Sequence, residues 1–211
     1  MNAVITALCA TAMLGATAHA GGNLLINADF EDTDLMGAPD VYGAAGWTAF
    51  DNAFTVDSSA LTTGPLGGMG QSLKMFGFGG VFQDFAATEG QEWNAGVFML
   101  NDSSDPMGAG QVAAINIEWR DGAGDLISFI GNGTFTGADA PVDEWLLQTV
   151  TGSAPAGTAS ARIVLITGNF IPAPGGGAPH FDNAFAEVIP APGSAALLGL
   201  GGLVATRRRR G

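Results

Sequence analysis

Carboxylates gather near the start of this sequence, where they could hold a metal ion. Glu31 closes an apolar stretch, and Asp29, Asp32 and Asp34 crowd the same segment. Calcium binds about six to eight oxygen ligands, which carboxylates and loop carbonyls supply. The spacing is not that of an EF-hand, because no glycine follows Asp34. A Ca²⁺ ligand set and a merely solvated acidic segment are the two interpretations.

Aromatic rings outside the core could stack on sugar C–H faces, with amides nearby for the hydroxyl groups. Tyr42 and Phe78 lie in predicted loops and are the best candidates, with Trp93 and Asn101 as further contacts. The alternative for Asn101 is that it only solvates its loop. The remaining tryptophans occupy strand positions typical of a core: Trp47, Trp119 and Trp145. We expect Trp119 and Trp145 to be buried.

Catalytic motifs are absent from the sequence, and we expect no enzyme. There is no Gly-x-Ser-x-Gly, His-Glu-x-x-His or phosphate-binding loop. Beyond residue 20 the only histidine is His180, and its spacing from Asp182 fits packing on one strand as well as chemistry. Two carboxylates could still form a glycosidase, and with 20 acidic residues the sequence does not exclude that function.

Charge separates the main part of the chain from its end. Four of the seven basic residues are Arg207, Arg208, Arg209 and Arg210. The rest carries only Lys74, Arg120 and Arg162 against 20 acidic residues, a formal charge of −17. Such a surface repels phosphate backbones, so we expect no nucleic-acid partner. It suits cations or neutral sugars, or it serves solubility alone.

Residues 1–20 have the pattern of a secretory signal peptide. An apolar stretch ends in Ala18-His19-Ala20, the small-x-small pattern that signal peptidase accepts after Ala20. The segment departs from the usual pattern in having no lysine or arginine before the apolar stretch, and a buried helix is the alternative. The only cysteine is Cys9, so the mature chain would have no disulfide.

The other end combines Pro190-Ala191-Pro192, a short apolar run over 194–205 and the four arginines. This order resembles the PEP-CTERM sorting signal, with Ala191 in place of the usual glutamate. The resemblance implies recognition by an exosortase-type protease and cleavage near Pro192. The apolar run is shorter than a membrane span of roughly 20 residues, so membrane contact would be transient. An ordinary tail anchor is the alternative. We therefore expect a signal peptide over 1–20, one domain over 21–188 and a sorting tail over 189–211.

Strand patterns fill the middle of the chain, and no helix is predicted there. Residues 111–120 alternate, and one set, Ala113, Ile115, Ile117 and Trp119, should face inward. A Gly-rich turn is predicted over 77–80 and a hairpin turn over 121–124. The strands are expected at 23–30, 46–56, 71–76, 81–86, 92–101, 111–120, 125–130, 144–152, 160–167 and 179–188. About ten short strands with regular turn signals predict an all-β sandwich.

Several short segments together resemble the galactose-binding-like jelly roll of carbohydrate-binding modules. They are Asn23 to Glu31, Gly46-Trp47, Glu144-Trp145, Ala154 to Gly157 and His180 to Asn183, in that order. The resemblance implies a single jelly-roll β-sandwich, here flanked by an N-terminal signal helix and a short C-terminal apolar helix. It also implies that Glu31 and Asp182 lie side by side and bind one structural Ca²⁺.

The predicted function is that of an exported, non-catalytic module that binds extracellular polysaccharide. It would be located in the cell envelope, at the outer surface or in the extracellular matrix. A structural matrix protein without a sugar ligand is the alternative, and a glycoside hydrolase is a more remote one. The concave face of the sandwich separates the first two, because exposed aromatics beside amides favour binding and a smooth surface favours a structural role.

Overall fold

The computed structural model describes residues 22–58 and 70–190, and those up to residue 189 belong to one compact unit. The described part is all β, as predicted, and contains no helix. It therefore has no helix that could cross a membrane. The predicted terminal helices and the processing residues Ala20, Pro192 and Arg207 to Arg210 lie outside it. Its nine strands are β1 (Asp40–Tyr42), β2 (Thr48–Asp57), β3 (Gln71–Ala86), β4 (Glu92–Leu100), β5 (Gln111–Arg120), β6 (Leu126–Thr136), β7 (Leu146–Ser153), β8 (Ser160–Asn169) and β9 (His180–Ile189).

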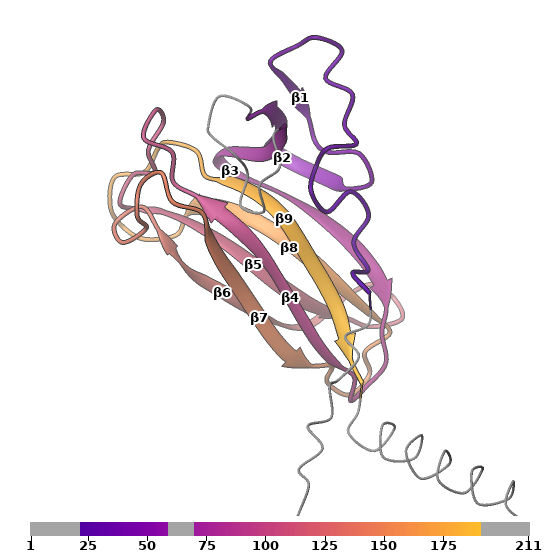
Figure 1. Cartoon of the computed structure of the whole chain (residues 1–211). Coiled ribbons are helices and arrows are strands. Elements are labelled where there is room, and N and C mark those ends of the chain that lie inside the picture. Colours follow the sequence, from indigo (N-terminus) through magenta and orange to yellow (C-terminus); the bar gives the residue numbers. More distant parts are fainter. Residues whose placement is uncertain (1–21, 59–69, 191–211) are drawn as a thin grey trace, which may run out of the picture. The chain divides into compact units, whose positions relative to one another are not determined.

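The strands form two layers that are joined by the long strand β3 (Figure 1). They hydrogen-bond in the order β6-β5-β8-β3-β9-β4-β7, and β2 joins β3 while β1 joins β2. The first half of β3 pairs with β9 and the second half with β8, so β3 belongs to both layers. At the open seam, Asn132 Nδ2 of β6 donates to the Thr149 carbonyl of β7 at 3.0 Å, which nearly closes the sheet.

Strand β3 corrects the predicted Gly-rich turn. Residues 71–76 and 81–86 are not two strands around a turn but parts of one continuous strand. Gly77 takes a φ of +63°, which allows a local bend without a reversal. Gly80 lies where a Cβ would come within 2.6 Å of the Leu165 carbonyl oxygen. This glycine therefore permits close packing against β8 rather than a turn.

The first predicted strand, over 23–30, is also wrong. This segment is an irregular one that lies along β9, with the Leu24 N–H donating to the Ala186 carbonyl at 2.8 Å. Asn27 and Phe30 have positive φ values, which a regular strand does not allow. Phe30 is nevertheless fully buried. The segment therefore covers part of the core without joining the sheet, and β1 forms within the loop expected after it.

The core confirms the inward face of β5. Ala113, Ile115, Ile117 and Trp119 are all buried, and Trp119 packs on Trp93 in a T-shaped arrangement with ring centroids 6.3 Å apart. Trp145 contradicts its prediction, because it precedes β7 and is only half-buried. The strand alternation from which its burial was predicted does not apply to a residue that lies outside the strand.

Candidate functional site

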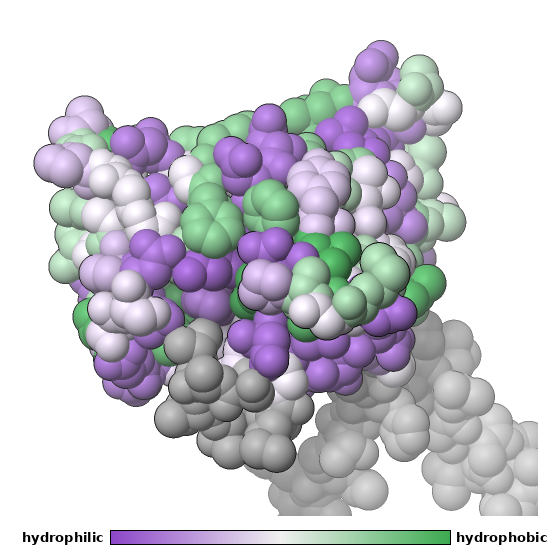
Figure 2. All heavy atoms as spheres, turned by 90° about the horizontal axis from the view of Figure 1, so that it is seen from above, coloured by the Kyte–Doolittle hydropathy of each residue, from purple (hydrophilic) through white to green (hydrophobic). Residues whose placement is uncertain are grey.

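Exposed aromatic rings gather on the outer face of the layer that contains β2, β3 and β8. Phe78 contacts Phe50 and Phe170, with centroid separations of 6.0 and 6.3 Å. Tyr42 does not belong to this group and instead contacts Phe54, with ring centroids 5.7 Å apart. Seen from the end where β1 lies, apolar side chains form patches among polar ones (Figure 2). The two aromatic residues predicted from loops, Tyr42 and Phe78, are thus exposed, but neither lies in a loop, since Tyr42 ends β1 and Phe78 lies within β3.

An apolar groove of about 470 Å³ crosses the outer face of β5, β6 and β8. Phe129 and Phe170 are 63% and 55% exposed, so their rings are open to a ligand. Gly133 contributes no side chain to the groove, and a Cβ at this position would make only an ordinary contact with Val112 Cγ1, at 3.5 Å. We call this the aromatic groove, and it is lined by Val112, Ala114, Asn116, Phe129, Gly131, Gly133, Ile166, Phe170 and Ile171.

Two predicted ligand contacts are not accessible. Trp93 is fully buried and packs on Phe85, with ring centroids 6.1 Å apart, so it presents no face to a ligand. Asn101 is also buried, and its Oδ1 accepts the Met107 N–H at 2.8 Å. Both predictions are therefore wrong. The opposite layer covers Trp93, and the loop that contains Met107 uses the hydrogen-bonding capacity of the Asn101 side chain.

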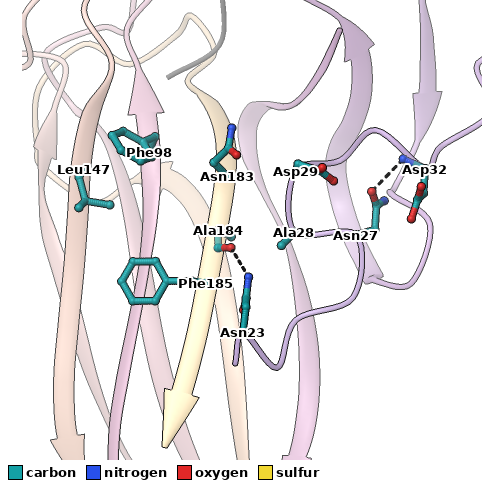
Figure 3. A pocket seen from close by; sticks show the side chains of 10 residues that line it. All are labelled: Asn23, Asn27, Ala28, Asp29, Asp32, Phe98, Leu147, Asn183, Ala184 and Phe185. Atoms are coloured by element: carbon teal, nitrogen blue, oxygen red, sulfur yellow. Dashed lines mark hydrogen bonds between the residues drawn. The ribbon is translucent and has the colours of Figure 1, made fainter. Parts of the chain in front are cut away.

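A second groove, of about 480 Å³, lies between the irregular N-terminal segment and β9 (Figure 3). We call it the acidic groove, and it is lined by Asn23, Asn27, Ala28, Asp29, Asp32, Phe98, Leu147, Asn183, Ala184 and Phe185. Asn23 Nδ2 donates to the Ala184 carbonyl at 2.9 Å and so holds the N-terminal segment against β9. The groove therefore combines an apolar floor from β4, β7 and β9 with carboxylates on the N-terminal side.

The two predicted metal ligands lie within electrostatic range of each other. Asp182 is only 4% exposed, and burial raises its pKa to about 7, with further contributions from Glu31 and Asp29. The Asn183 N–H donates to Asp182 Oδ1 at 2.6 Å and partly opposes this shift. Glu31 accepts the Gln71 N–H at 2.8 Å. Over residues 22–58 and 70–190, no three acidic, histidine or cysteine side chains converge as a metal-binding group.

His180 forms a buried polar pair with Ser72 of β3. The His180 Nδ1 and Ser72 Oγ atoms are 2.8 Å apart, and both side chains are buried. Burial lowers the pKa of His180 to about 4, helped by nearby Lys74. The imidazole is therefore neutral at physiological pH. Because both groups are covered, neither reaches a substrate in this conformation.

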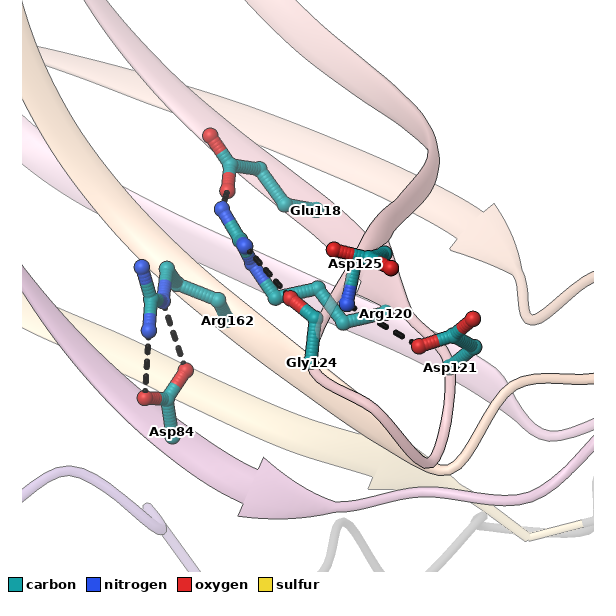
Figure 4. A network of polar contacts seen from close by, with 7 residues as sticks. All are labelled: Asp84, Glu118, Arg120, Asp121, Gly124, Asp125 and Arg162. Atoms are coloured by element: carbon teal, nitrogen blue, oxygen red, sulfur yellow. Dashed lines mark hydrogen bonds and ion pairs between the residues drawn. The ribbon is translucent and has the colours of Figure 1, made fainter.

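Charged side chains of β3, β5 and β8 form a network of polar contacts (Figure 4). Glu118 of this network lies opposite Phe129 of the aromatic groove in strand register. Arg162 of β8 donates from Nε and Nη2 to the two carboxylate oxygens of Asp84 on β3, at 2.7 and 2.8 Å. Its guanidinium carbon lies 3.6 Å from the Phe82 ring centroid. The hydrogen bonds to Asp84 raise the pKa of Arg162 above its ordinary value. Arg120 of β5 is paired with Glu118 on the same strand.

The sequence offered one clue to the aromatic groove. The alternation of β5 places Val112, Ala114 and Asn116 opposite the inward set, and these three residues line the groove. Phe129 and Phe170, by contrast, were not predicted as site residues. Phe129 lies on β6, which the predicted turn over 121–124 folds back beside β5. Phe170 directly follows β8, whose pairing with β5 joins distant parts of the chain, and no local pattern encodes that second pairing.

Comparison with known proteins shows the fold but not a family. No protein-family model matches the sequence, and no curated protein does either. A family 16 carbohydrate-binding module is similar at a TM-score of 0.50 and 15% identity, covering 78% of this chain and 99% of that one.

Two larger chains share the same fold over part of their length. The tandem CBM22 domain of Paenibacillus barcinonensis has a TM-score of 0.51 and 15% identity over 83% of this chain and 48% of that one. The enzymatically active domain of tailspike protein 4 of bacteriophage CBA120 has a TM-score of 0.52 and 15% identity over 79% of this chain. The present chain spans 21% of that tailspike chain. The body of this protein is therefore a β-sandwich similar to those of carbohydrate-binding modules.

Proposed function

We propose that this protein is an exported, non-catalytic module that binds extracellular polysaccharide in the aromatic groove. The observation that carries the proposal is an open groove with exposed Phe129 and Phe170 and one amide, Asn116. Sugar C–H faces stack on such rings while amides bind hydroxyl groups, as in most ligand sites that combine apolar walls with a few polar groups. The similarity to carbohydrate-binding modules supports the same role.

The aromatic groove also bears on the alternative of a purely structural matrix protein. A surface that only spaces or decorates a matrix needs no open groove lined by rings. Monomeric proteins rarely leave contiguous apolar patches exposed unless these patches bind something. Phe129 and Phe170 therefore favour the binding function.

Filling the aromatic groove is expected to abolish polysaccharide binding. Gly133→Leu would occupy the groove, and Gly133 has room for a side chain and no positive φ. Phe129→Ala removes one exposed ring and should weaken binding roughly tenfold, the equivalent of about 1.4 kcal/mol. The measurement is affinity electrophoresis of the full chain in gels containing xylan, β-1,4-galactan or mannan.

The matched control is Gly122→Leu, at a hairpin turn where a side chain would meet no neighbouring atom within 4 Å. It should migrate like the wild type, and all variants should keep the wild-type melting temperature. If Gly133→Leu and Phe129→Ala are retarded as strongly as the wild-type protein in a gel that retards it, the binding surface lies elsewhere.

We also propose that the chain is processed at both ends on its way to the cell surface. The support is the Ala-His-Ala sequence that ends at Ala20 and the Pro190-Ala191-Pro192 segment with its arginine cluster. In a host with an exosortase-type enzyme, mass spectrometry of surface-extracted protein should find an N-terminus after Ala20 and a C-terminus near Pro192. A surface-extracted chain that retains Arg207 to Arg210 would contradict the sorting proposal.

A structural Ca²⁺ bound by Glu31 and Asp182 is the third part of the proposal. Its support is the burial of Asp182, the raised pKa of this carboxyl and the electrostatic contribution of Glu31. A divalent cation would relieve the cost of holding these carboxylates close together, with backbone carbonyls completing its oxygen ligands. The role would be to stabilise a fold without disulfides and not to take part in chemistry.

A further inference from the structure

Four residues stand side by side across the outer face at the end of the aromatic groove. In strand register, Phe129 of β6 lies opposite Glu118 of β5, Glu118 opposite Arg162 of β8, and Arg162 opposite Asp84 of β3. We call Glu118, Arg162 and Asp84 the charged row. The next row along β5 contains Asn116, which lines the groove. A sugar chain that lies in the groove and passes Phe129 would therefore meet the charged row next.

Both arginines on this face are already engaged. Arg162 gives two hydrogen bonds to Asp84, and Arg120 binds Glu118 and the Gly124 carbonyl (Figure 4). The only other basic residue of the described ranges besides His180 is Lys74, which pairs with Asp105 at 3.0 Å. Glu118 also acts on Arg162 electrostatically. The two arginines and their partners Glu118 and Asp84 thus balance in charge, and Asp121 and Asp125 of the turn after β5 add negative charge nearby (Figure 4).

Pairing of the arginines works against an anionic ligand. A polysaccharide carboxylate or sulfate needs a cation with free N–H donors, and a bidentate guanidinium is the usual partner. Here Asp84 binds the Nε–Nη2 edge of Arg162, and Glu118 binds Nη2 of Arg120, so each guanidinium already has a carboxylate partner. A ligand carboxylate that takes the bidentate edge of Arg162 would have to displace Asp84, which would then be left unpaired beside it.

We infer that Asp84 and Glu118 determine the charge class of the ligand, so that the aromatic groove takes uncharged polysaccharide and rejects chains that contain uronic acids. The inference rests on the proposed function of the groove. The two carboxylates neutralise Arg162 and Arg120, and Asp84 also holds the Arg162 guanidinium over the Phe82 ring. Asp84 and Glu118 are thus specificity-determining residues rather than mere surface ion pairs.

The test is a gain of binding. Asp84→Asn combined with Glu118→Gln keeps side-chain size and frees both arginines. By calorimetry on the full chain, this variant should bind oligogalacturonate at least about tenfold more tightly than the wild type, because each freed guanidinium gains a charged partner. The gain should disappear at high salt, while affinity for neutral oligosaccharides changes less than about twofold. Asp84→Asn alone should give roughly threefold.

A matched control removes two negative charges elsewhere. Glu89→Gln with Glu144→Gln changes two exposed carboxylates outside the groove, and it should leave oligogalacturonate binding as in the wild type. Equal gains in the two double variants, or wild-type binding of oligogalacturonate as tight as that of a neutral oligosaccharide, would overturn the inference. A wild-type protein that binds no neutral polysaccharide would instead overturn the proposed function, and the gain for the anionic ligand would still be measurable.

Discussion

Replacement of Trp93 by alanine is expected to lower the free energy of unfolding by about 3–5 kcal/mol, the usual cost of truncating a large core aromatic. Trp93 is fully buried between the layers and contacts both Phe85 and Trp119. The loss combines apolar area returned to solvent with a cavity that two neighbouring rings cannot fill. Urea unfolding should show a lower midpoint and an unchanged slope, which identifies a change in stability rather than in the unfolded state.

Two variants test the assignment of this loss to packing. Trp93→Phe keeps a ring and removes an indole N–H that finds no hydrogen-bond acceptor in the described part of the chain, so it should cost clearly less. Trp145→Ala, at a half-buried position before β7, should also cost less than Trp93→Ala. A loss below about 1 kcal/mol for Trp93→Ala would show that this ring does not hold the layers together.

In the absence of calcium, Asp182→Asn is expected to stabilise the protein above neutral pH. The pKa of Asp182 is raised from 3.8 to about 7 in the folded state. Between about pH 4 and 7 the folded state therefore keeps a proton that the unfolded chain has lost. Stability from this group is present at the acidic end and falls as pH rises through this window, by a few kcal/mol in total. An asparagine side chain cannot ionise, so the variant should not show that fall.

His180 acts in the opposite direction over an overlapping window. Its pKa is lowered from 6.5 to about 4 in the folded state. As pH falls from about 6.5 to 4, the imidazole therefore binds a proton in the unfolded chain but not in the folded one. Stability from His180 is therefore lost on acidification and partly cancels the effect of Asp182 in the wild type. Both the wild type and Asp182→Asn contain His180, so its contribution cancels when their unfolding free energies are subtracted. This difference should favour the variant increasingly as pH rises.

Calcium should reverse this order. A cation that binds only the folded state stabilises it by about 2.7 kcal/mol when present at a hundredfold above its Kd. The ion favours the ionised carboxylate, so calcium affinity should rise as pH passes the pKa of Asp182, near 7. The wild type should then gain stability from calcium at pH 8, whereas Asp182→Asn should gain far less.

Thermal unfolding at fixed ionic strength measures these effects, with Mg²⁺ in place of Ca²⁺ as the control because Mg²⁺ demands a tighter octahedral site. The fixed ionic strength removes the general screening of the acidic surface. If EGTA leaves the wild-type melting temperature unchanged and Asp182→Asn responds to calcium like the wild type, Glu31 and Asp182 do not form a calcium site.

Features that depend on local periodicity could be predicted from the amino-acid sequence. The alternation over 111–120 predicted which residues of β5 face inward, because strand side chains alternate between faces. The Asp-Gly-Ala-Gly segment predicted the turn after β5, where the Gly124 N–H donates to the Asp121 carbonyl at 3.0 Å. The spread of such strand and turn signals also predicted an all-β body.

Features that depend on contacts between distant strands required the folded chain. The glycines over 77–80 indicate a turn in isolation, yet β8 and β9 pair with the two halves of one strand and keep it extended. Trp93 lies on a strand with apolar residues on both sides, so its burial follows from Phe85 and Trp119 across the core. Likewise, Phe170 lines the same groove as Phe129 only because β8 pairs with β5 across a long stretch of sequence, whereas β6 follows β5 through the predicted hairpin. A local pattern specifies which residues share a face, but the packing of other strands decides whether that face becomes core or groove.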